Sequence, residues 1–260
     1  MKLRDIFEKL DDLAPFEDAA QWDNSGLLVG REESEIKKVM LALDARGDVI
    51  EAAVREGAQL IVTHHPLIFG SLKKVNAEDF VGRRILTLAE NRIACIAMHT
   101  NFDRHVMNIE AARMLGLERM ETFAEAAQTE RGELGFGYVG ELPGSLTLEE
   151  CAERVKEVFK LEKVDFFGDR QERISRAAIV SGSGAEFVDE ARQKGAQLLV
   201  TGDVKYHNGI DAVEKGICVI NAGHYGVEKL FVPYMKKFFE RSLPEVEAVE
   251  HAEETPFGAL

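Results

Sequence analysis

The heptapeptide GAQLIVT at residues 57–63 returns as GAQLLVT at residues 195–201, and six of the seven positions are identical. Each copy ends in a short apolar run that is typical of a buried strand. The same offset of 138 residues aligns two preceding elements without a gap: a predicted strand at 39–45 with 177–183, and a predicted helix at 48–56 with 186–194. The chain is therefore predicted to contain two related units in which strands and helices alternate.

Further patterns extend both units. Apolar runs rich in Val, Ile and Leu, separated by helical patterns, predict α/β units with mostly parallel or mixed sheets flanked by helices. Additional strands are predicted at 93–98, 132–140, 217–222 and 246–249, and additional helices at 1–13, 79–91, 106–115, 148–159 and 230–239. Residues 145–147, followed by Glu149 and Glu150, resemble a helix start. The strand at 93–98 aligns with 217–222 at a smaller offset, so the second copy is about 13 residues shorter there.

The composition is that of a globular protein. The 260 residues include 45% apolar and 30% charged side chains, and the formal net charge is −14. No run of about 18 apolar residues occurs, and the N-terminal pattern is an amphipathic helix, so neither a membrane span nor a signal peptide is predicted. The acidity argues against nucleic acid as a partner. The three cysteines, Cys95, Cys151 and Cys218, form no metal-binding or redox pair by spacing, which is typical of reduced thiols in the cytoplasm.

Two adjacent histidines follow the predicted strand at 60–63. His64 and His65 precede Pro66, and the carboxyl end of a strand in an α/β sheet is where ligand sites form. Neighbouring side chains of an extended chain point to opposite faces, so this pair is predicted to suit two metal ions better than one. A pair of turn histidines without a ligand is the alternative.

A His-x-x-x-carboxylate pattern follows a predicted strand in each unit. His99 is followed by Asp103, and His224 is followed by Glu228, with an offset of 125 between the members of the two pairs. At a spacing of four residues, the two side chains share one face of a helical turn and can bind one ion. Glu228 alone would also suit a first helical turn, where the helix dipole favours an acid. That alternative does not explain the matching pair or the adjacent histidines.

The donor types indicate the kind of metal and the number of ions. Histidine together with carboxylate favours zinc, iron, cobalt, nickel or manganese over calcium or magnesium. Five candidate ligands fit two ions about 3.5–4 Å apart with a bridging carboxylate: His64, His65, Asp103, His224 and Glu228. The predicted first unit, residues 1–125 with 229–260, carries the first three, and the predicted second unit, residues 126–228, carries His224 and Glu228. His99 is predicted to hydrogen-bond a ligand or the substrate, or to cap the strand.

The second copy differs where the first has its adjacent histidines. Gly202 and Asp203 stand at those positions, and the segment from Gly202 to His207, with Lys205, is a candidate for substrate contacts. An ordinary polar loop is the alternative. Gly182 and Gly184 follow a predicted strand, and the backbone amides of such a turn can hold a phosphate. A tight turn would explain the two glycines equally well.

With these motifs, the chain closely resembles the Nif-three-like dinuclear-metal family, whose members are known as GTP cyclohydrolase 1 type 2 homologues. Six segments carry the resemblance: QWDNSGLLVG (21–30), LIVTHHPLIF (60–69), MHTNFD (98–103), IVSGSG (179–184), LVTGDVKYH (199–207) and INAGHYGVEK (220–229). They span nearly the whole chain. Longer family members have an inserted domain between the two halves, so this chain resembles the short form.

The resemblance implies a site and an assembly. The two ions would be held by the five candidate ligands, with Glu228 as the bridge, in the cleft between the two α/β units. The chain would form a toroidal homohexamer whose metal sites face an internal cavity. Residues 22–24 would have a mainly structural role near the site.

The leading hypothesis is a cytoplasmic, metal-dependent hydrolase that acts on a nucleotide, with GTP as the substrate that the family name suggests. Metal-bound hydroxide would be the nucleophile, Asp103 or His99 would move protons, and Lys205 or the turn at Gly182 and Gly184 would hold phosphates. A phosphoesterase that uses the same ions is one alternative. A non-catalytic, metal-loaded hexamer that binds or scaffolds a partner is the other, and no membrane contact is predicted.

Overall fold

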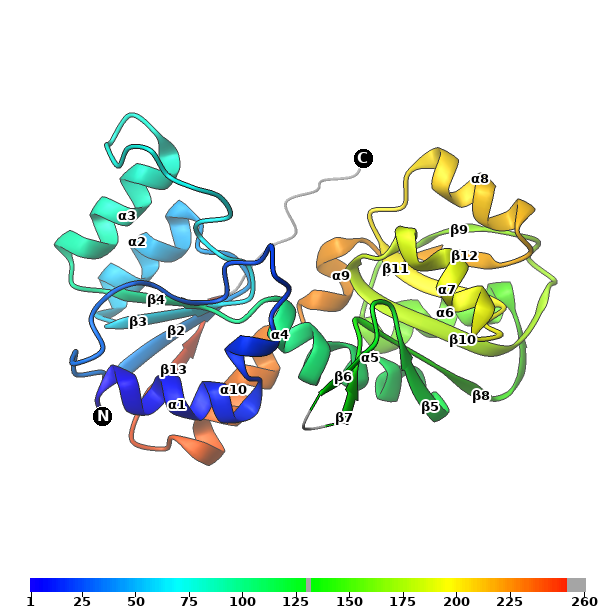
Figure 1. The fold of residues 1–260 in the computed structure, drawn as a ribbon, viewed down its shortest axis with the longest axis horizontal. Helices are drawn as coiled ribbons and strands as arrows, with labels where there is room; N and C mark the ends of the chain where they lie inside the picture. The colour runs from blue at the N-terminus through cyan, green and yellow to red at the C-terminus, as the bar shows by residue number, and fades with distance from the viewer. Residues whose placement is uncertain (130–131, 252–260) are drawn as a thin grey trace. The chain divides into compact units, whose positions relative to one another are not determined.

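The computed structural model describes residues 1–129 and 132–251, which form two units (Figure 1). One unit comprises residues 1–102 and the chain from 229 onward, and the other comprises residues 103–228. The chain first passes between the units at 102/103 rather than at the predicted 125/126, so Asp103 belongs to the second unit and not to the first. Residues 130–131 and 252–260, which the sequence assigned to the second and first units, lie outside the described residues.

The first unit is built on a five-stranded sheet with the order β1–β4–β3–β2–β13. β1 runs antiparallel to β4, and the other neighbouring strands are parallel. The strands are β1 (Gly26–Val29), β2 (Lys38–Ala42), β3 (Leu60–Thr63), β4 (Ala94–Ala97) and β13 (Glu247–Glu250). The helices are α1 (Leu3–Leu13), the 3-10 turn η1 (Phe16–Asp18), α2 (Gly47–Glu56), α3 (Phe80–Glu90), α4 (Thr100–Phe102) and α10 (Phe231–Ser242). Because β2, β3 and β4 are parallel, the residues that follow them start from one edge of the sheet.

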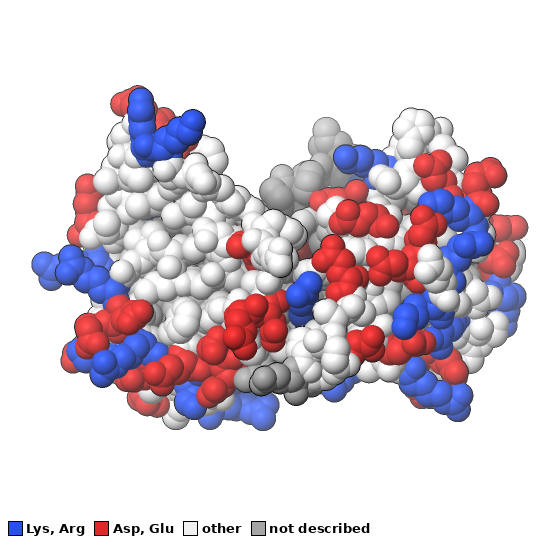
Figure 2. Space-filling model, in the orientation of Figure 1, with Lys and Arg blue, Asp and Glu red and all other residues white. Residues whose placement is uncertain are grey.

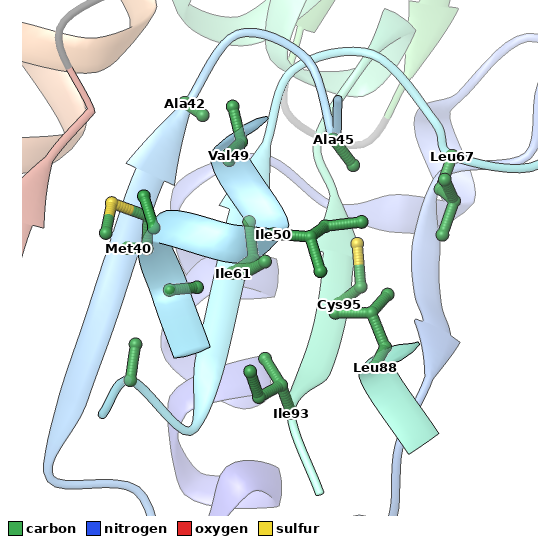
Figure 3. Close-up of a cluster of buried hydrophobic side chains, with 13 residues drawn as sticks. Met40, Ala42, Ala45, Val49, Ile50, Ile61, Leu67, Leu88, Ile93 and Cys95 are labelled. Carbon is green, nitrogen blue, oxygen red and sulfur yellow. The ribbon is translucent and has the colours of Figure 1, made fainter. Parts of the chain in front are cut away.

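A core of aliphatic side chains fixes the central strands of this sheet. Figure 3 shows Val49 and Ile50 of α2 among Met40, Ile61 and Cys95 of the strands, and each of these five side chains is at most 2% exposed. The buried residues of α2 recur three and four positions apart, as expected for a helix with one apolar face. Burial of one such side chain stabilises the fold by about 1.5–3 kcal/mol. This packing holds in place the strand ends from which the histidine-bearing segments emerge.

The second unit contains a six-stranded sheet with the order β5–β8–β10–β11–β12–β9 and a separate two-stranded ribbon, β6–β7. β10, β11 and β12 are parallel, whereas β5, β8 and β9 pair antiparallel to their neighbours. The strands are β5 (Glu118–Phe123), β6 (Ala127–Thr129), β7 (Gly132–Leu134), β8 (Gly137–Thr147), β9 (Asp165–Phe167), β10 (Arg173–Ser183), β11 (Leu198–Gly202) and β12 (Cys218–Asn221). The helices are the π-helical turn η2 (Asp103–Met107), α5 (Asn108–Leu115), α6 (Leu148–Phe159), the 3-10 turn η3 (Ala185–Phe187), α7 (Val188–Gln193), α8 (Tyr206–Glu214) and α9 (His224–Glu228).

Strand register confirms the internal repeat. Val39 pairs with Leu60 in the first unit, and Ala177 pairs with Leu198 in the second. Both members of these pairs are related by the 138-residue offset found in the sequence. Each unit thus has a parallel trio of strands in the same register, within a mixed sheet flanked by helices as the sequence predicts. Among the described residues, none of the helices has both the length and the apolar composition needed to cross a bilayer.

The position of the first boundary has a physical cause in the helical segment that follows β4. α5 packs against β8 and β10 of the second sheet, and its buried face includes Ala111, Ala112 and Leu115. The Asn108 side-chain oxygen also accepts a hydrogen bond of 2.7 Å from the Ser181 amide of β10. The segment that begins at Asp103 therefore buries its apolar face in the second unit, although the strand before it belongs to the first.

Candidate metal centre

The two adjacent histidines leave the end of β3 with their rings close together. The His65 amide donates to the Leu43 carbonyl and the Thr63 hydroxyl donates to the His65 carbonyl, so the chain turns as soon as the strand ends. The centroids of the His64 and His65 rings are 4.9 Å apart. The expectation that these side chains point to opposite faces is wrong, because strand alternation stops at Thr63.

Hydrogen bonds fix the tautomer of both rings. His64 is fully buried, and its Nδ1 lies 2.9 Å from the Met98 carbonyl oxygen. The Nδ1 of His65 lies 3.0 Å from a carboxylate oxygen of Asp44, which follows β2. A carbonyl or a carboxylate can only accept, so Nδ1 carries the hydrogen and Nε2 carries the lone pair. This is the arrangement in which a histidine binds a metal through Nε2.

His99, which follows β4, has the same kind of partner. Its Nδ1 lies 2.9 Å from the Asp23 carboxylate, which also accepts hydrogen bonds from the Thr100 amide and the Ser25 hydroxyl. Burial alone would raise the pKa of Asp23, but the hydrogen bond from His99, together with those from Thr100 and Ser25, lowers that pKa well below its usual range. Asp23 is therefore an ionised acceptor that holds the His99 ring in one orientation.

The three imidazoles form one cluster in the first unit. The centroid of the His99 ring lies 5.2 Å from that of His64 and 5.5 Å from that of His65. One ligand atom from each ring lies within 4.8 Å of the others, so the three could hold one metal ion. The sequence placed His99 outside the ligand set, whereas its geometry also suits direct coordination. Three histidines with an open fourth position are a common catalytic ligand set for zinc.

The second unit contributes a His–Glu pair on α9. The Nε2 of His224 lies 3.1 Å from Oε2 of Glu228, which is only 3% exposed. The Nδ1 of His224 lies 2.8 Å from the Asp203 carboxylate. The Nε2 of this ring therefore faces the Glu228 carboxylate, the second potential metal ligand of the pair. Asp203 follows β11 with a φ of 52°, in the left-handed region that Asp tolerates better than most residues. The predicted one-face arrangement of His224 and Glu228 is thus present.

The Glu228 carboxylate occupies space that only a glycine leaves open. Gly182 has a φ of +63°, and a Cβ atom placed on it would lie 2.5 Å from Oε1 of Glu228 and 3.6 Å from Cε1 of His224. The turn at Gly182 therefore forms a cradle for the acid. The Gly184 amide donates to the Thr201 hydroxyl at 2.8 Å, so protein contacts account for both glycines, and their role in phosphate binding stays a prediction.

Asp103 lies at the start of the π-helical turn η2, a feature that is frequent at functional sites. Its side chain is 9% exposed and accepts a 3.2 Å hydrogen bond from the Ser181 hydroxyl. The Asn108 side-chain amide donates to the Asp103 carbonyl at 3.3 Å. Asp103 is thus held on the second unit, beside the strand that also carries Gly182.

The donor chemistry of the two units fits divalent first-row metal ions. The first unit offers three imidazoles, and the second offers an imidazole and two buried carboxylates. Nitrogen and carboxylate donors of this kind suit zinc, iron, cobalt, nickel or manganese. The residues present therefore fit the metal that the family resemblance implies.

The remaining predicted substrate residues are at the start of α8. Lys205 is the residue before α8, and His207 lies in the first turn of that helix, where it is exposed and its ring is 5.3 Å from that of Tyr206. No described contact brings either of them to Glu228 or Asp103, and their role stays a prediction. No role for Asp44 was predicted, and Asp23 was predicted to have a mainly structural role. The motif QWDNSG contains Asp23, but only the fold places it on His99.

Comparisons with known proteins agree with this geometry. The sequence profile of the family described as Duf34/NIF3 (NGG1p interacting factor 3) matches residues 1–256. The chain belongs to this family. A Clostridium acetobutylicum relative named GTP cyclohydrolase 1 type 2 homolog is 35% identical over 245 residues, which cover 94% of this NIF3-family chain and 91% of the relative. A solved structure of a Staphylococcus aureus protein, at 29% identity, has a TM-score of 0.89 and covers 100% of this chain and 99% of that one.

Family members differ in length. A Staphylococcus aureus relative, also named GTP cyclohydrolase 1 type 2 homolog, is 26% identical in an alignment of 328 residues that covers 86% of this chain and 89% of the relative. An alignment longer than the 260 residues of this NIF3-family chain requires that the relative contain segments that this chain lacks. This chain is thus a short form of the family, as its sequence predicts.

Proposed function

We propose that this NIF3-family protein is a metal-dependent hydrolase that acts on a nucleotide, with a GTP cyclohydrolase-like reaction as the leading candidate. One observation carries the proposal: Nδ1 of His64, His65, His99 and His224 each faces a carbonyl or carboxylate oxygen. Such partners fix metal-binding histidines and raise their basicity. The names of the curated relatives support the choice of GTP.

Two divalent ions are proposed to be held by His64, His65, Asp103, His224 and Glu228, as the family resemblance implies. When bound, such ions polarise the substrate and lower the pKa of a coordinated water. The buried position of Glu228 in the Gly182 cradle supports its role as a ligand. The same resemblance supports a homohexamer, for which the solution mass would be six times the 29.0 kDa of one chain.

Proton transfer is assigned to His99 and Asp103. The Asp23 carboxylate holds Nδ1 of His99, so Nε2 can accept a proton while the buried negative charge stabilises the resulting imidazolium. Asp103 is held by the Ser181 hydroxyl and the π-turn. A substrate proton within hydrogen-bonding distance of Nε2 of His99 would then have a defined acceptor.

The first experiment is elemental analysis of purified protein, before and after reconstitution with divalent metals. We expect about two ions per chain in the wild type and a clear loss of metal in His64→Ala and Glu228→Ala. His251→Ala, a change at a histidine beyond β13, should keep the wild-type content. One ion or none after reconstitution of the wild type would rule out the proposed pair.

Product analysis with GTP then tests the reaction. Released formate would identify opening of the purine ring, and release of phosphate without formate would identify a phosphohydrolase that cleaves the triphosphate. Absence of turnover of GTP and other nucleotides by metal-replete protein would refute the hydrolase proposal. His99→Gln separates the two roles of that residue: a loss of turnover with unchanged metal content identifies a proton acceptor, whereas a loss of metal identifies a ligand.

A further inference from the structure

A pocket of about 400 Å³ opens beside His65 in the first unit. Its walls come from the segment after β2, which includes Asp44 and Arg46, from the chain after β3, which includes Phe69, and from the start of α3, which includes Arg84. Its volume lies in the range of small-molecule sites. The roles proposed above for the five metal ligands do not involve this pocket.

The chain after β3 forms one wall of the pocket. The second copy of the internal repeat has no connection of comparable length at this position. Residues 64–79 connect β3 to α3 in the first unit, whereas residues 203–205 suffice to connect β11 to α8 in the second. Connections between a strand and a helix usually contain two to six residues, and long ones without secondary structure are commonly functional. The extra residues of the first copy therefore build the pocket wall.

This connection, residues 64–79, is anchored at both ends and exposed in its middle. Leu67 is buried in the core shown in Figure 3, and the Asn24 side chain donates to the Ile68 carbonyl at 2.7 Å. At the other end, the Arg83 guanidinium donates to the Ala77 carbonyl at 2.8 Å. Between these anchors, the Phe69 side chain is 59% exposed although its ring lies only 5.8 Å from that of His99. An anchored segment that presents an aromatic ring to solvent is suited to stacking on a planar ligand.

The segment after β3 and the start of α3 have a charge opposite to that of the whole chain, whereas the wall after β2 adds Asp44 and Arg46. Residues 66–84 contain four basic side chains, Lys73, Lys74, Arg83 and Arg84, and two acidic ones, Glu78 and Asp79, although the chain has a net charge of −14. Figure 2 shows basic side chains gathered at the outer end of the connection between β3 and α3. A basic region on an acidic protein attracts anionic ligands.

Arg84 lines the pocket with a guanidinium group that could bind an anion. Its guanidinium lies 5.0 Å from the centre of the Phe80 ring, and no described carboxylate or carbonyl accepts a hydrogen bond from it. Arg46, in contrast, forms a two-pronged ion pair with Asp48 at 3.2 and 2.8 Å. The charges of Asp44 and Asp48 also act on Arg84. Because neither carboxylate accepts a described hydrogen bond from it, its planar set of donors stays available for a phosphate or carboxylate.

We propose that this pocket binds the phosphate-bearing part of a nucleotide through Arg84 and stacks its planar base on Phe69, next to the histidine cluster. The inference rests on the proposed nucleotide hydrolase function and names the subsite that such a substrate would use. His65 lines the pocket and belongs to the histidine cluster. A ligand held there would thus lie next to the imidazoles of the first unit.

Calorimetric titration with GMP and with guanosine, in the presence of EDTA, tests the pocket without the metals. We expect Arg84→Gln to weaken GMP binding about tenfold or more, because it removes charge-assisted hydrogen bonds to a phosphate. Guanosine binding should be unchanged by the same substitution. Arg55→Gln, which removes one exposed positive charge from the end of α2, is the matched control and should bind GMP like the wild type. Arg84→Lys should retain part of the affinity, and circular dichroism verifies that each variant is folded.

The outcomes separate this inference from the function on which it rests. Unchanged GMP affinity in Arg84→Gln, or an equal loss in Arg55→Gln, would overturn the pocket assignment, and metal content and GTP turnover would still test the hydrolase. Arg84-dependent GMP binding by a protein that shows no turnover would support the pocket and refute the hydrolase. If Phe69→Ser lowers the solution mass and leaves GMP affinity unchanged, the segment instead contacts another copy of the chain, which also overturns the proposal.

Discussion

Three of the four histidines with fixed tautomers are held by aspartates that no sequence spacing identifies. The partners of His65, His99 and His224 lie 21, 76 and 21 residues away in the chain. The histidines themselves could be predicted, because they follow strands whose apolar patterns are clear. Their partners could not, because a carboxylate far away in sequence meets a ring only when two strand ends come together at one edge of a sheet.

The internal repeat shows which residue of the first copy corresponds to one of these partners. Asp203 stands where the first copy has His65, at the offset of 138 residues. In the second unit, this position no longer offers an imidazole, and its carboxylate instead orients the His224 ring. The sequence showed the substitution but not its consequence, because the new role depends on the neighbouring strand β12 and the start of α9.

Replacing Gly182 with alanine adds one methyl group, and this change should affect both the stability of the fold and its affinity for metal. We expect Gly182→Ala to lower the free energy of unfolding by about 1–2 kcal/mol, because alanine is strained at positive φ. It should also lower metal affinity about tenfold or more, because the new Cβ would lie 2.5 Å from the Glu228 carboxylate and must displace it. Urea denaturation measures the first effect, and competition with a chromophoric chelator measures the second.

Gly57→Ala is the matched control for this prediction. Gly57 has a φ of +66°, close to that of Gly182, but no atom lies within 4 Å of a Cβ placed there. The same backbone strain should therefore lower its stability by a similar amount without changing metal affinity. Equal metal affinities in the two alanine variants would show that Glu228 does not depend on the Gly182 cradle.

At the level of elements, the long apolar or amphipathic segments were predictable, and short or unpatterned ones were not. β3 and α6 have the predicted bounds, because their apolar periodicity is complete within the element. Half of the β5 residues are exposed and its buried residues are adjacent, and β9 spans only Asp165–Phe167, so neither has a period to detect. α8 contains Gly209, which weakens a helix. The ring of Phe167 would lie 2.3 Å from a Cβ at Gly209, so tight packing there outweighs helix propensity.

The start of α6 offers a prediction about a single helix. Thr147 and Glu150 form a reciprocal cap, in which the Thr147 hydroxyl accepts from the Glu150 amide and the Glu150 carboxylate accepts from the Thr147 amide. Thr147→Ala should lower the free energy of unfolding by about 1 kcal/mol, because an amide at the helix start loses its acceptor. Thr147→Ser keeps the hydroxyl and should stay close to the wild type in urea denaturation. Equal destabilisation by serine and alanine would contradict the cap.

At the scale of the whole chain, the repeat could be predicted in its strands but not in the path between its units. The sequence placed Asp103 in the first unit because it follows β4 at a short distance. The structure assigns it to the second, because the apolar face of α5 packs on β8 and β10. A helix has the same periodicity whichever sheet it covers, so its partner is a property of the tertiary fold. The asymmetry in loop length, in contrast, was visible in the sequence and is where the Arg84 pocket lies.

All three thiols are buried, Cys95 in the first unit and Cys151 and Cys218 in the second. This burial should make the free energy of unfolding decrease at alkaline pH. Burial raises the pKa of Cys95 to about 12 and the pKa values of Cys151 and Cys218 to about 11. Thiols of an unfolded chain ionise near pH 8.5. Above that pH the unfolded chain binds fewer protons than the folded chain, so the free energy of unfolding falls as pH rises, until the folded thiols also ionise.

Urea denaturation from about pH 8 to about pH 10 measures this decline, to which each thiol contributes at most about 1.4 kcal/mol per pH unit. Lysine and tyrosine titrations add to the same slope, so the comparison that isolates a thiol is with Cys95→Ala. This variant should be less stable at every pH, because it leaves a cavity in the core of the first unit. Its stability should nevertheless fall less steeply with pH than that of the wild type. Equal slopes in the two proteins would mean that Cys95 ionises as readily in the folded chain as in the unfolded one, which its complete burial opposes.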